Sequence, residues 1–129
     1  MTIFSKIIAG DIPCYKIAED DRYFAFLDIS PLQKGHTLVV PKHEVDYIFD
    51  LDDEELAGMQ VFAKKVALAI RKAIPCQKVG QCVIGLEVPH AHIHLVPMQT
   101  EDDIRFNNPH LKLTPEEFEA IAASIRAQF

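Results

Sequence analysis

The stretch HAHIHLV at residues 90–96 decides how the rest of this chain is interpreted. Successive side chains of a β-strand point to opposite faces, so His90, His92 and His94 are expected on one face, with the apolar residues between them behind. Imidazoles spaced roughly 7 Å apart along a strand would make a poor hydrophobic core. The pattern is instead typical of a site for phosphate chemistry or for a metal.

Three interpretations of this row follow from the residues. The histidines can be structural and hydrogen-bonded within the fold. They can bind a metal, since histidine is a common neutral ligand, although no carboxylate or cysteine lies at a regular ligand spacing beside them. They can also transfer a phosphoryl or nucleotidyl group, because neutral imidazole attacks phosphorus and neighbouring imidazoles donate protons to phosphate oxygens and to the leaving group. The residues favour this third interpretation.

Outward from the row, the residue pattern predicts an α+β fold. Strands are expected at residues 15–18, 22–28, 36–40, 78–84 and 88–96. A helix is expected from Asp52, as N-cap, to about Ala73, and a second one from Thr114 as N-cap, with Pro115 at its first position and Glu117 completing a capping box. This order of elements predicts a mainly antiparallel sheet with two helices.

Asp28 is a candidate binding residue that has two interpretations. It shares strand parity with Phe24 and Phe26, so its carboxylate could accept two ribose hydroxyls while an aromatic ring packs on a base. An aspartate before Ile-Ser-Pro is equally well explained as the first residue of a turn. The residues alone leave both open.

The other histidines carry less information. His36 begins a predicted strand, where a lone histidine is more often structural than catalytic, and His43 and His110 lie in polar loops and are expected at the surface. The chain has no Walker loop, no Gly-x-Gly-x-x-Gly and no His-Glu-x-x-His. None of the common nucleotide or zinc-protease motifs therefore competes with the histidine row.

Length and composition favour a single domain in a reducing compartment. The chain has 129 residues, 49% of them hydrophobic, and three cysteines without a Cys-x-x-Cys pair, which are expected to be reduced thiols in the cytoplasm. The formal net charge of −6 argues against binding to long nucleic acid but not against one nucleotide. We expect no membrane span and no signal peptide, because the chain has no apolar run of about 18 residues and no charged, then apolar, N-terminal segment.

These features resemble the histidine-triad (HIT) family, which is named for a His-φ-His-φ-His-φ-φ motif such as residues 90–96. Three further blocks match the family in order and spacing: TIFSKIIAGDIP at 2–13, AFLDISP at 25–31 and GHTLVVPK at 35–42. Glu-Val-Pro at 87–89 precedes the triad, as in many bacterial members. Four motifs in register over most of the chain are far more specific than the triad alone.

The resemblance implies a homodimeric nucleotide hydrolase or transferase that acts at the α-phosphate of purine nucleotides. His92 would be the nucleophile and form a nucleotidyl-histidine, His94 would bind phosphate oxygens, and His90, with His36 beside it, would orient His92. Asp28 would bind the ribose hydroxyls. A backbone N–H at Glu87 would serve phosphate. Apolar residues would line the base and ribose pocket: Phe4, Ile7, Phe26, Ile29 and Leu38.

The chain departs from the family pattern at three places. Some members carry Cys-x-x-Cys near the N-terminus, which joins two histidines in a structural zinc site; here Thr2 and Ser5 stand instead, so no zinc is expected and His36 and His90 should form hydrogen bonds. In the shortened block before the triad, Leu86 stands where an amide that faces the phosphate or leaving group is common. The C-terminal part, 99–129, ends in a helix rather than in a short Trp-containing tail.

The resulting prediction is one HIT domain over 1–129, with its core at about 3–98 and a C-terminal extension at 99–129. We expect a cytoplasmic, homodimeric, metal-independent nucleotide hydrolase, most simply a purine nucleoside phosphoramidase. Hydrolysis of dinucleoside polyphosphates or nucleotidyl sulfates, a nucleotide-binding regulator with weak catalysis, and a metalloprotein that uses the histidine row are the alternatives. No nucleic-acid polymer and no membrane partner is expected.

Overall fold

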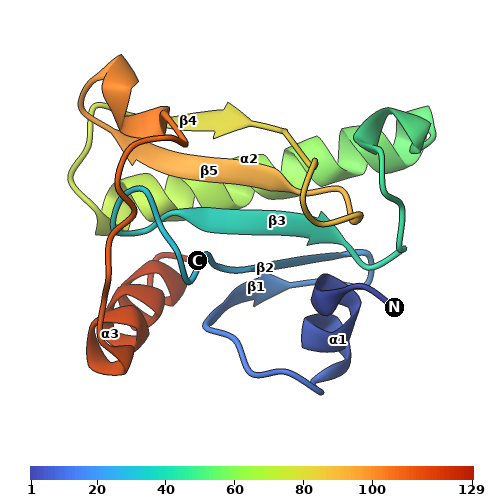
Figure 1. Cartoon of the computed structure of the whole chain (residues 1–129), viewed down its shortest axis with the longest axis horizontal. Coiled ribbons are helices and arrows are strands. Elements are labelled where there is room, and N and C mark those ends of the chain that lie inside the picture. Colours follow the sequence, from blue (N-terminus) through green and yellow to red (C-terminus); the bar gives the residue numbers. More distant parts are fainter.

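A five-stranded antiparallel sheet with strand order β1-β2-β3-β5-β4 forms the centre of the protein (Figure 1). The computed structural model describes residues 1–129. The strands are β1 (Lys16–Glu19), β2 (Tyr23–Leu27), β3 (Thr37–Pro41), β4 (Lys78–Cys82) and β5 (Ile93–Met98). The helices are α1 (Ile3–Ala9), α2 (Asp53–Ala73) and α3 (Pro115–Arg126), with short 3-10 turns η1 (Ile48–Asp50) and η2 (Glu101–Ile104).

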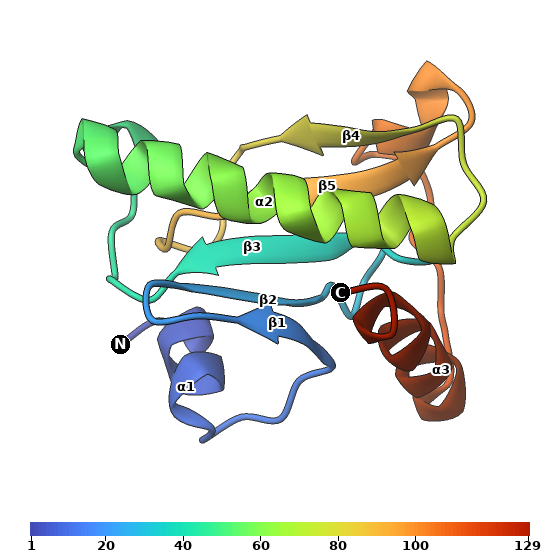
Figure 2. The ribbon, with the colours of Figure 1, turned by 180° about the vertical axis from the view of Figure 1, so that it is seen from behind.

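The long helix α2 crosses one face of the sheet and forms the main hydrophobic core with it (Figure 2). Strand residues such as Ala25 and Val39 point to this face, where they meet the apolar stripe of α2 that includes Met59 and Val66. Helix α3 adds Phe118 and two further buried residues to the same core. The C-terminal extension therefore packs into the main core and is not a separate unit.

The opposite face carries a smaller apolar cluster, and the candidate site lies beside it. Alternation along β2 and β3 places Phe24, Phe26 and Leu38 on this face, and Phe4 of α1 packs against them. The Phe4 ring meets the Phe26 ring edge-on at 5.5 Å between centroids. Helix α1 thus packs on β2 and β3 through one buried aromatic residue, and this face holds side chains that line the cavity described below.

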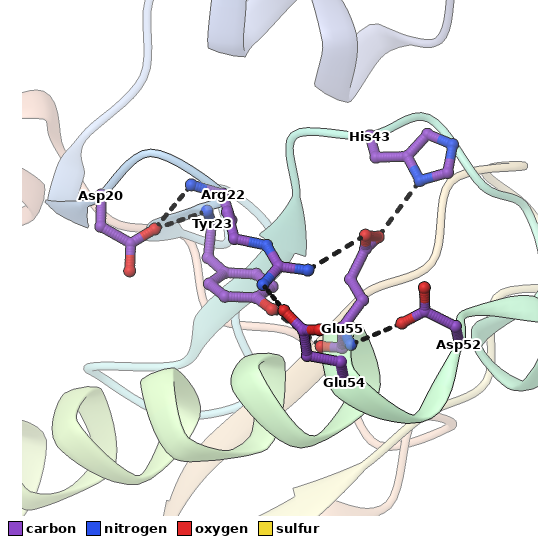
Figure 3. A network of polar contacts seen from close by, with 7 residues as sticks. All are labelled: Asp20, Arg22, Tyr23, His43, Asp52, Glu54 and Glu55. Atoms are coloured by element: carbon purple, nitrogen blue, oxygen red, sulfur yellow. Dashed lines mark hydrogen bonds and ion pairs between the residues drawn. The ribbon is translucent and has the colours of Figure 1, made fainter.

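A polar network fastens the first turn of α2 to the start of β2 (Figure 3). Asp52 caps α2 by accepting a hydrogen bond from the Glu55 amide at 2.8 Å, and the Tyr23 hydroxyl donates to the Glu55 carbonyl at 2.8 Å. A Cβ at Gly58 would collide with that tyrosine hydroxyl, so a glycine is required one helical turn later. The other members are Asp20, Arg22, His43 and Glu54.

The structure confirms the predicted α+β class and mainly antiparallel sheet, with three differences in detail. It contains a third α-helix, α1, which the sequence pattern did not predict. Strand β5 begins at Ile93 and not at Val88, because the Ala91 amide donates to the Val45 carbonyl at 2.6 Å instead of joining a strand ladder. Strand β4 ends at Cys82, two residues before the predicted end of 78–84. The other predicted strands and the two predicted helices form within one or two residues of the expected ends. No helix has both the length and the apolar character needed to cross a bilayer.

Candidate active site

A cavity of about 540 Å³ lies against α1, the end of β2 and the start of β5. The residues that the resemblance assigned to the nucleotide all line it: Phe4, Ile7, Phe26, Asp28, Ile29, Leu38 and Glu87. His92 and His94 line it as well. His90 and His36 do not, because both rings are completely buried behind the cavity wall. Most of the remaining lining is apolar, as expected for a site that binds a flat base.

His92 presents an unprotonated nitrogen to this cavity. Its Nδ1 lies 2.7 Å from the backbone oxygen of His90, and a carbonyl can only accept, so Nδ1 carries the proton. The lone pair of the neutral ring is then on Nε2. Nε2 of His92 has no hydrogen-bond partner in the protein. Because every buried side-chain nitrogen and oxygen has one, this atom is not buried and is open to the cavity. This arrangement makes Nε2 available as a nucleophile.

His94 presents the opposite group, an N–H donor. The Leu32 amide donates to Nδ1 of His36 at 3.0 Å, which leaves the His36 proton on Nε2. That Nε2–H lies 3.0 Å from Nδ1 of His94 and donates to it, so neutral His94 carries its proton on Nε2. This nitrogen also has no protein partner and is open to the cavity. A lone pair on His92 and a donor on His94 thus lie side by side, with ring centroids 4.8 Å apart.

Burial keeps the rings of His36, His94 and His90 neutral. Burial, with a smaller effect of the neighbouring histidines, lowers the pKa of His36 to about 3. Burial and the adjacent His92 lower the pKa of His94 to about 4. Burial also lowers the pKa of His90. The proton positions assigned above to His36 and His94 therefore hold at neutral pH.

His90 belongs to a second polar cluster, behind the cavity and next to α1. Its Nε2–H donates to the Pro41 carbonyl at 2.8 Å, and its Nδ1 lies 2.8 Å from the Thr2 hydroxyl. Ser5 and Glu44 complete the cluster. His36 was expected in this group and lies elsewhere, because it precedes the first residue of β3 whereas Pro41 ends that strand. The expected grouping of Thr2, Ser5, His36 and His90 is therefore wrong for His36, and Glu44 takes that place.

Asp28 forms the turn that the sequence suggested and also lines the cavity. Its Oδ1 accepts a hydrogen bond from the Ser30 amide at 2.8 Å, as in an Asx turn. Its other oxygen, Oδ2, lies 3.6 Å from Nε2 of His36, which is beyond hydrogen-bond range. The carboxylate lines the cavity with Oδ2 unused by the protein. Burial raises the pKa of Asp28.

Comparison with known proteins places this arrangement in a family. Residues 9–101 match the HIT domain. The chain belongs to the HIT family. It is 37% identical over 129 residues to the adenosine 5'-monophosphoramidase hnt1 of Schizosaccharomyces pombe, which covers 98% of this chain and 96% of that protein.

Solved HIT structures share the whole fold. The Hit-like protein of Bartonella henselae, described as involved in cell-cycle regulation, has a TM-score of 0.85 and 32% identity and covers 99% of this chain and 96% of its own. A zinc-bound histidine triad protein of Mycobacterium smegmatis has a TM-score of 0.83 and 30% identity, with 98% and 91% covered. The similarity extends beyond the matched domain to both ends of the chain.

Two further residues of the cavity lie outside the part that matches the HIT domain: Phe106, which no sequence pattern indicated, and His110, which was predicted only as a surface residue. The Phe106 ring packs edge-on against the ring of His94, with centroids 4.7 Å apart. Both nitrogens of His110 face backbone oxygens, those of Ser30 at 2.6 Å and Phe106 at 3.0 Å, and these hydrogen bonds raise the pKa of His110. Neither residue belongs to a periodic segment, so no sequence pattern pointed to the cavity.

The donor sets in this HIT protein fit a metal poorly. Donor atoms of Asp28, His36 and His94 lie within 4.8 Å of one another. A metal on Nε2 of His36 would move its proton to Nδ1, which already accepts from the Leu32 amide. In the second cluster, Thr2 and Ser5 offer hydroxyls, which zinc rarely takes. The first set has the atom types of a zinc site, but two of its nitrogens are already joined to each other by a hydrogen bond, and the second set lacks three nitrogen, sulfur or carboxylate ligands.

Proposed function

We propose that the chain is a nucleotide hydrolase that acts at the α-phosphate, most simply on purine nucleoside phosphoramidates. The observation that carries the proposal is the proton arrangement in the cavity: a free lone pair on Nε2 of His92 beside an N–H on Nε2 of His94. Attack on phosphorus needs the first and the negatively charged phosphate oxygens need the second. The similarity to an adenosine 5'-monophosphoramidase supports the substrate class.

The reaction would proceed by two displacements. In the first, Nε2 of His92 forms a bond to the α-phosphorus, the P–N bond of the substrate breaks, and the amine leaves with a proton taken from solvent water; the proton that water gives up in the second step returns to the solvent. In the second, water attacks the same phosphorus, the P–Nε2 bond breaks, and the nucleoside monophosphate leaves as water gives up a proton. The His90 carbonyl stabilises the intermediate, because it accepts from the Nδ1–H that stays on the positively charged ring. One high barrier thus becomes two lower ones.

The cavity walls suit the nucleoside part of such a substrate. Phe4, Phe26 and Leu38 offer an apolar surface to a purine ring. Oδ2 of Asp28, which the protein leaves without a hydrogen-bond partner, would accept the ribose hydroxyls. We further propose that neither step uses a metal, since the available donor sets are already committed to one another.

Leaving-group choice belongs to the mouth of the cavity. Leu86 lines the mouth with 89% of its surface exposed, at the position where the family commonly has an amide. A dinucleoside polyphosphate, with nucleotide in place of amine as the leaving group, is therefore the second candidate substrate. A regulator with weak catalysis is the third possibility, and the experiment below separates it from the other two.

The test is release of AMP from adenosine 5'-phosphoramidate with EDTA present throughout, for the wild type beside His92→Asn. Asparagine keeps an amide able to donate to the His90 carbonyl but offers no nucleophilic nitrogen. We expect release by the wild type and a loss of at least about a thousandfold in the variant. Release that needs added metal would contradict the proposal. No release here, but turnover of diadenosine tetraphosphate, would move the assignment to dinucleotides, and AMP binding without turnover would leave only the regulator.

A further inference from the structure

The N-terminal cap of α1 is connected to the candidate nucleophile through His90, whose side chain bonds the cap and whose backbone oxygen bonds His92. Thr2 caps α1 by accepting the Ser5 amide at 3.0 Å, and the same hydroxyl lies 2.8 Å from Nδ1 of His90. The backbone oxygen of His90 then accepts from Nδ1 of His92 at 2.7 Å. Glu44 anchors the other end, because its carboxylate accepts from the Thr2 amide at 2.9 Å and from the Ser5 hydroxyl.

The direction of each bond is determined by its partners. His90 donates through Nε2 to the Pro41 carbonyl, so its Nδ1 can only accept. The Thr2 hydroxyl already accepts the Ser5 amide, and its single proton therefore goes to His90. The Ser5 hydroxyl, in turn, gives its proton to the Glu44 carboxylate. The alternative, donation from the Thr2 hydroxyl to Ser5 Oγ at 3.2 Å, would leave Nδ1 of the buried His90 ring without a donor.

This cluster holds the His90 ring on both edges, in a position where it has no access to solvent. The ring lies between the Thr2 hydroxyl and the Pro41 carbonyl and is 0% exposed. The Phe4 ring, two residues after the cap, packs edge-on against both His90 and His92, at 5.7 and 5.0 Å between centroids. A shift of α1 would therefore displace the His90 ring and strain the backbone that carries the carbonyl acceptor of the His92 proton.

We propose that Thr2, anchored by Ser5 and Glu44, is a positioning residue that orients His90 and thereby keeps the nucleophilic lone pair of His92 on the nitrogen that faces the cavity. Thr2 does not line the cavity and touches no substrate. Its hydroxyl links the first turn of α1 to the histidine triad by hydrogen bonds alone. The proposal rests on the proposed function for its kinetic part but not for its spectroscopic part.

A neutral hydroxyl suits this task better than a carboxylate would. Burial lowers the pKa of His90, and the Thr2 hydroxyl adds no charge that would draw a proton onto the ring. The carboxylate of Glu44 forms no hydrogen bond with His90. It accepts hydrogen bonds from the Ser5 hydroxyl and the Thr2 amide, which lower its pKa. The neighbouring His92 and His43 are the other titratable groups near His90.

The test compares Thr2→Val with Thr2→Ser and with Thr114→Val, in the full chain. Valine keeps the shape of threonine but removes the hydroxyl, whereas serine retains it. Thr114 is the matched control, because it caps α3 in the same manner and does not line the cavity. The first readout is kcat and KM for adenosine 5'-phosphoramidate, and the second is the ¹⁵N NMR signature of the His92 ring without substrate.

We expect Thr2→Val to lower kcat by about tenfold or more with little change in KM, because a misdirected nucleophile affects the chemical step and not nucleotide binding. Its His92 spectrum should show a mixture of the Nδ1–H and Nε2–H forms, whereas wild type, Thr2→Ser and Thr114→Val show Nδ1–H alone. Wild-type kcat with an unchanged spectrum in Thr2→Val would overturn the proposal. An equal kcat loss in Thr114→Val would also overturn it, since that loss reports helix capping only.

Glu44→Ala provides a second variant if Thr2→Val does not fold. It removes the anchor of the Thr2 amide and the Ser5 hydroxyl but leaves the α1 cap intact. It should shift kcat and the His92 spectrum in the same direction by a smaller factor, and no shift in either would count against the proposal. If the wild type releases no AMP, the proposed function fails, and the spectra of the same variants still decide whether Thr2 controls the His92 proton.

Discussion

His92 and His94 have the same strand parity but carry their protons on opposite ring nitrogens. The difference arises from their partners: a backbone carbonyl accepts from Nδ1 of His92, whereas the Nε2–H of His36 donates to Nδ1 of His94. One buried amide, that of Leu32, determines the second assignment. Two identical side chains thus present a lone pair and an N–H donor to the cavity through their neighbours alone.

At the same scale, we predict that Asp28→Asn weakens AMP binding and abolishes the preference for AMP over 2'-deoxy-AMP. Asparagine can still accept the Ser30 amide through Oδ1, so the turn survives, but an NH₂ replaces the oxygen that would accept a ribose hydroxyl. The loss should be about 2 kcal/mol, as for a hydrogen bond to a charged group. Calorimetric titration measures it, and equal affinities of wild type and variant would show that Asp28 serves only the turn.

Residue identities could be predicted from the sequence further than their contacts. Parity alone indicated that His90, His92 and His94 share a face, whereas for Asp28 parity left a turn and a binding role open and the family resemblance assigned it to the site. The Thr2 cluster could not be predicted, since it depends on the segment after Pro41 turning back to bring Glu44 to α1. Proton positions were equally out of reach, because they depend on which backbone group the fold turns toward each ring and on the meeting of His36 with His94, 58 residues apart.

At the scale of secondary structure, Gly58→Ala should destabilise the fold although alanine is the better helix former. Replacing an exposed helical glycine normally stabilises by about 0.5–1 kcal/mol. Here the new methyl group would collide with the Tyr23 hydroxyl, which donates to the Glu55 carbonyl (Figure 3). Denaturant unfolding should show a net loss of about 1–3 kcal/mol.

A double variant separates this collision from other effects. On a Tyr23→Phe background the hydroxyl is absent, so Gly58→Ala should become neutral or stabilising. If Gly58→Ala costs the same with and without the hydroxyl, the close approach of Tyr23 is not the reason for the glycine.

Helix starts were the most predictable elements and the ends of loops the least. Asp52 and Thr114 were recognised as caps and do cap α2 and α3, the latter with the full capping box. Helix α1 was missed because seven residues carry too little periodicity, although Thr2 caps it. The start of β5 was placed too early because the alternation of histidines continues through Ala91, whose backbone amide donates to the Val45 carbonyl and not to a neighbouring strand.

For the whole molecule, we predict that stability falls as the pH drops below about 6.5. The pKa of His36 is lowered to about 3 and that of His94 to about 4, so the unfolded chain takes up these protons first. Each neutral buried histidine then costs about 2 kcal/mol of stability between pH 6.5 and 5. The raised pKa of Asp28 acts in the opposite sense and offsets part of this loss.

Denaturant unfolding at pH 7 and pH 5 measures the effect, and His36→Gln, which removes one buried imidazole, should flatten the pH dependence. Equal unfolding free energies at the two pH values in the wild type would show that these histidines are not held neutral by the fold.

We also predict that two copies of the chain associate. Strand β4 lies at an open edge of the sheet, joined to α2 by reciprocal hydrogen bonds between Gln60 and Gln81 at 2.8 Å. On the same face of α2, Val61 and Leu68 are 53% and 52% exposed. Sedimentation should give a dimer for the wild type and a monomer for Val61→Glu with Leu68→Glu, and a monomeric wild type at assay concentration would contradict the prediction.

The central claim, metal-free attack by His92, is tested most directly by the stereochemical course at phosphorus. The substrate is an adenosine 5'-phosphoramidate made chiral at phosphorus with sulfur and hydrolysed in ¹⁸O-labelled water with EDTA present. Two successive in-line displacements, first by Nε2 of His92 and then by water, give net retention of configuration. Net inversion would mean that water attacks in a single step and that no nucleotidyl-histidine forms.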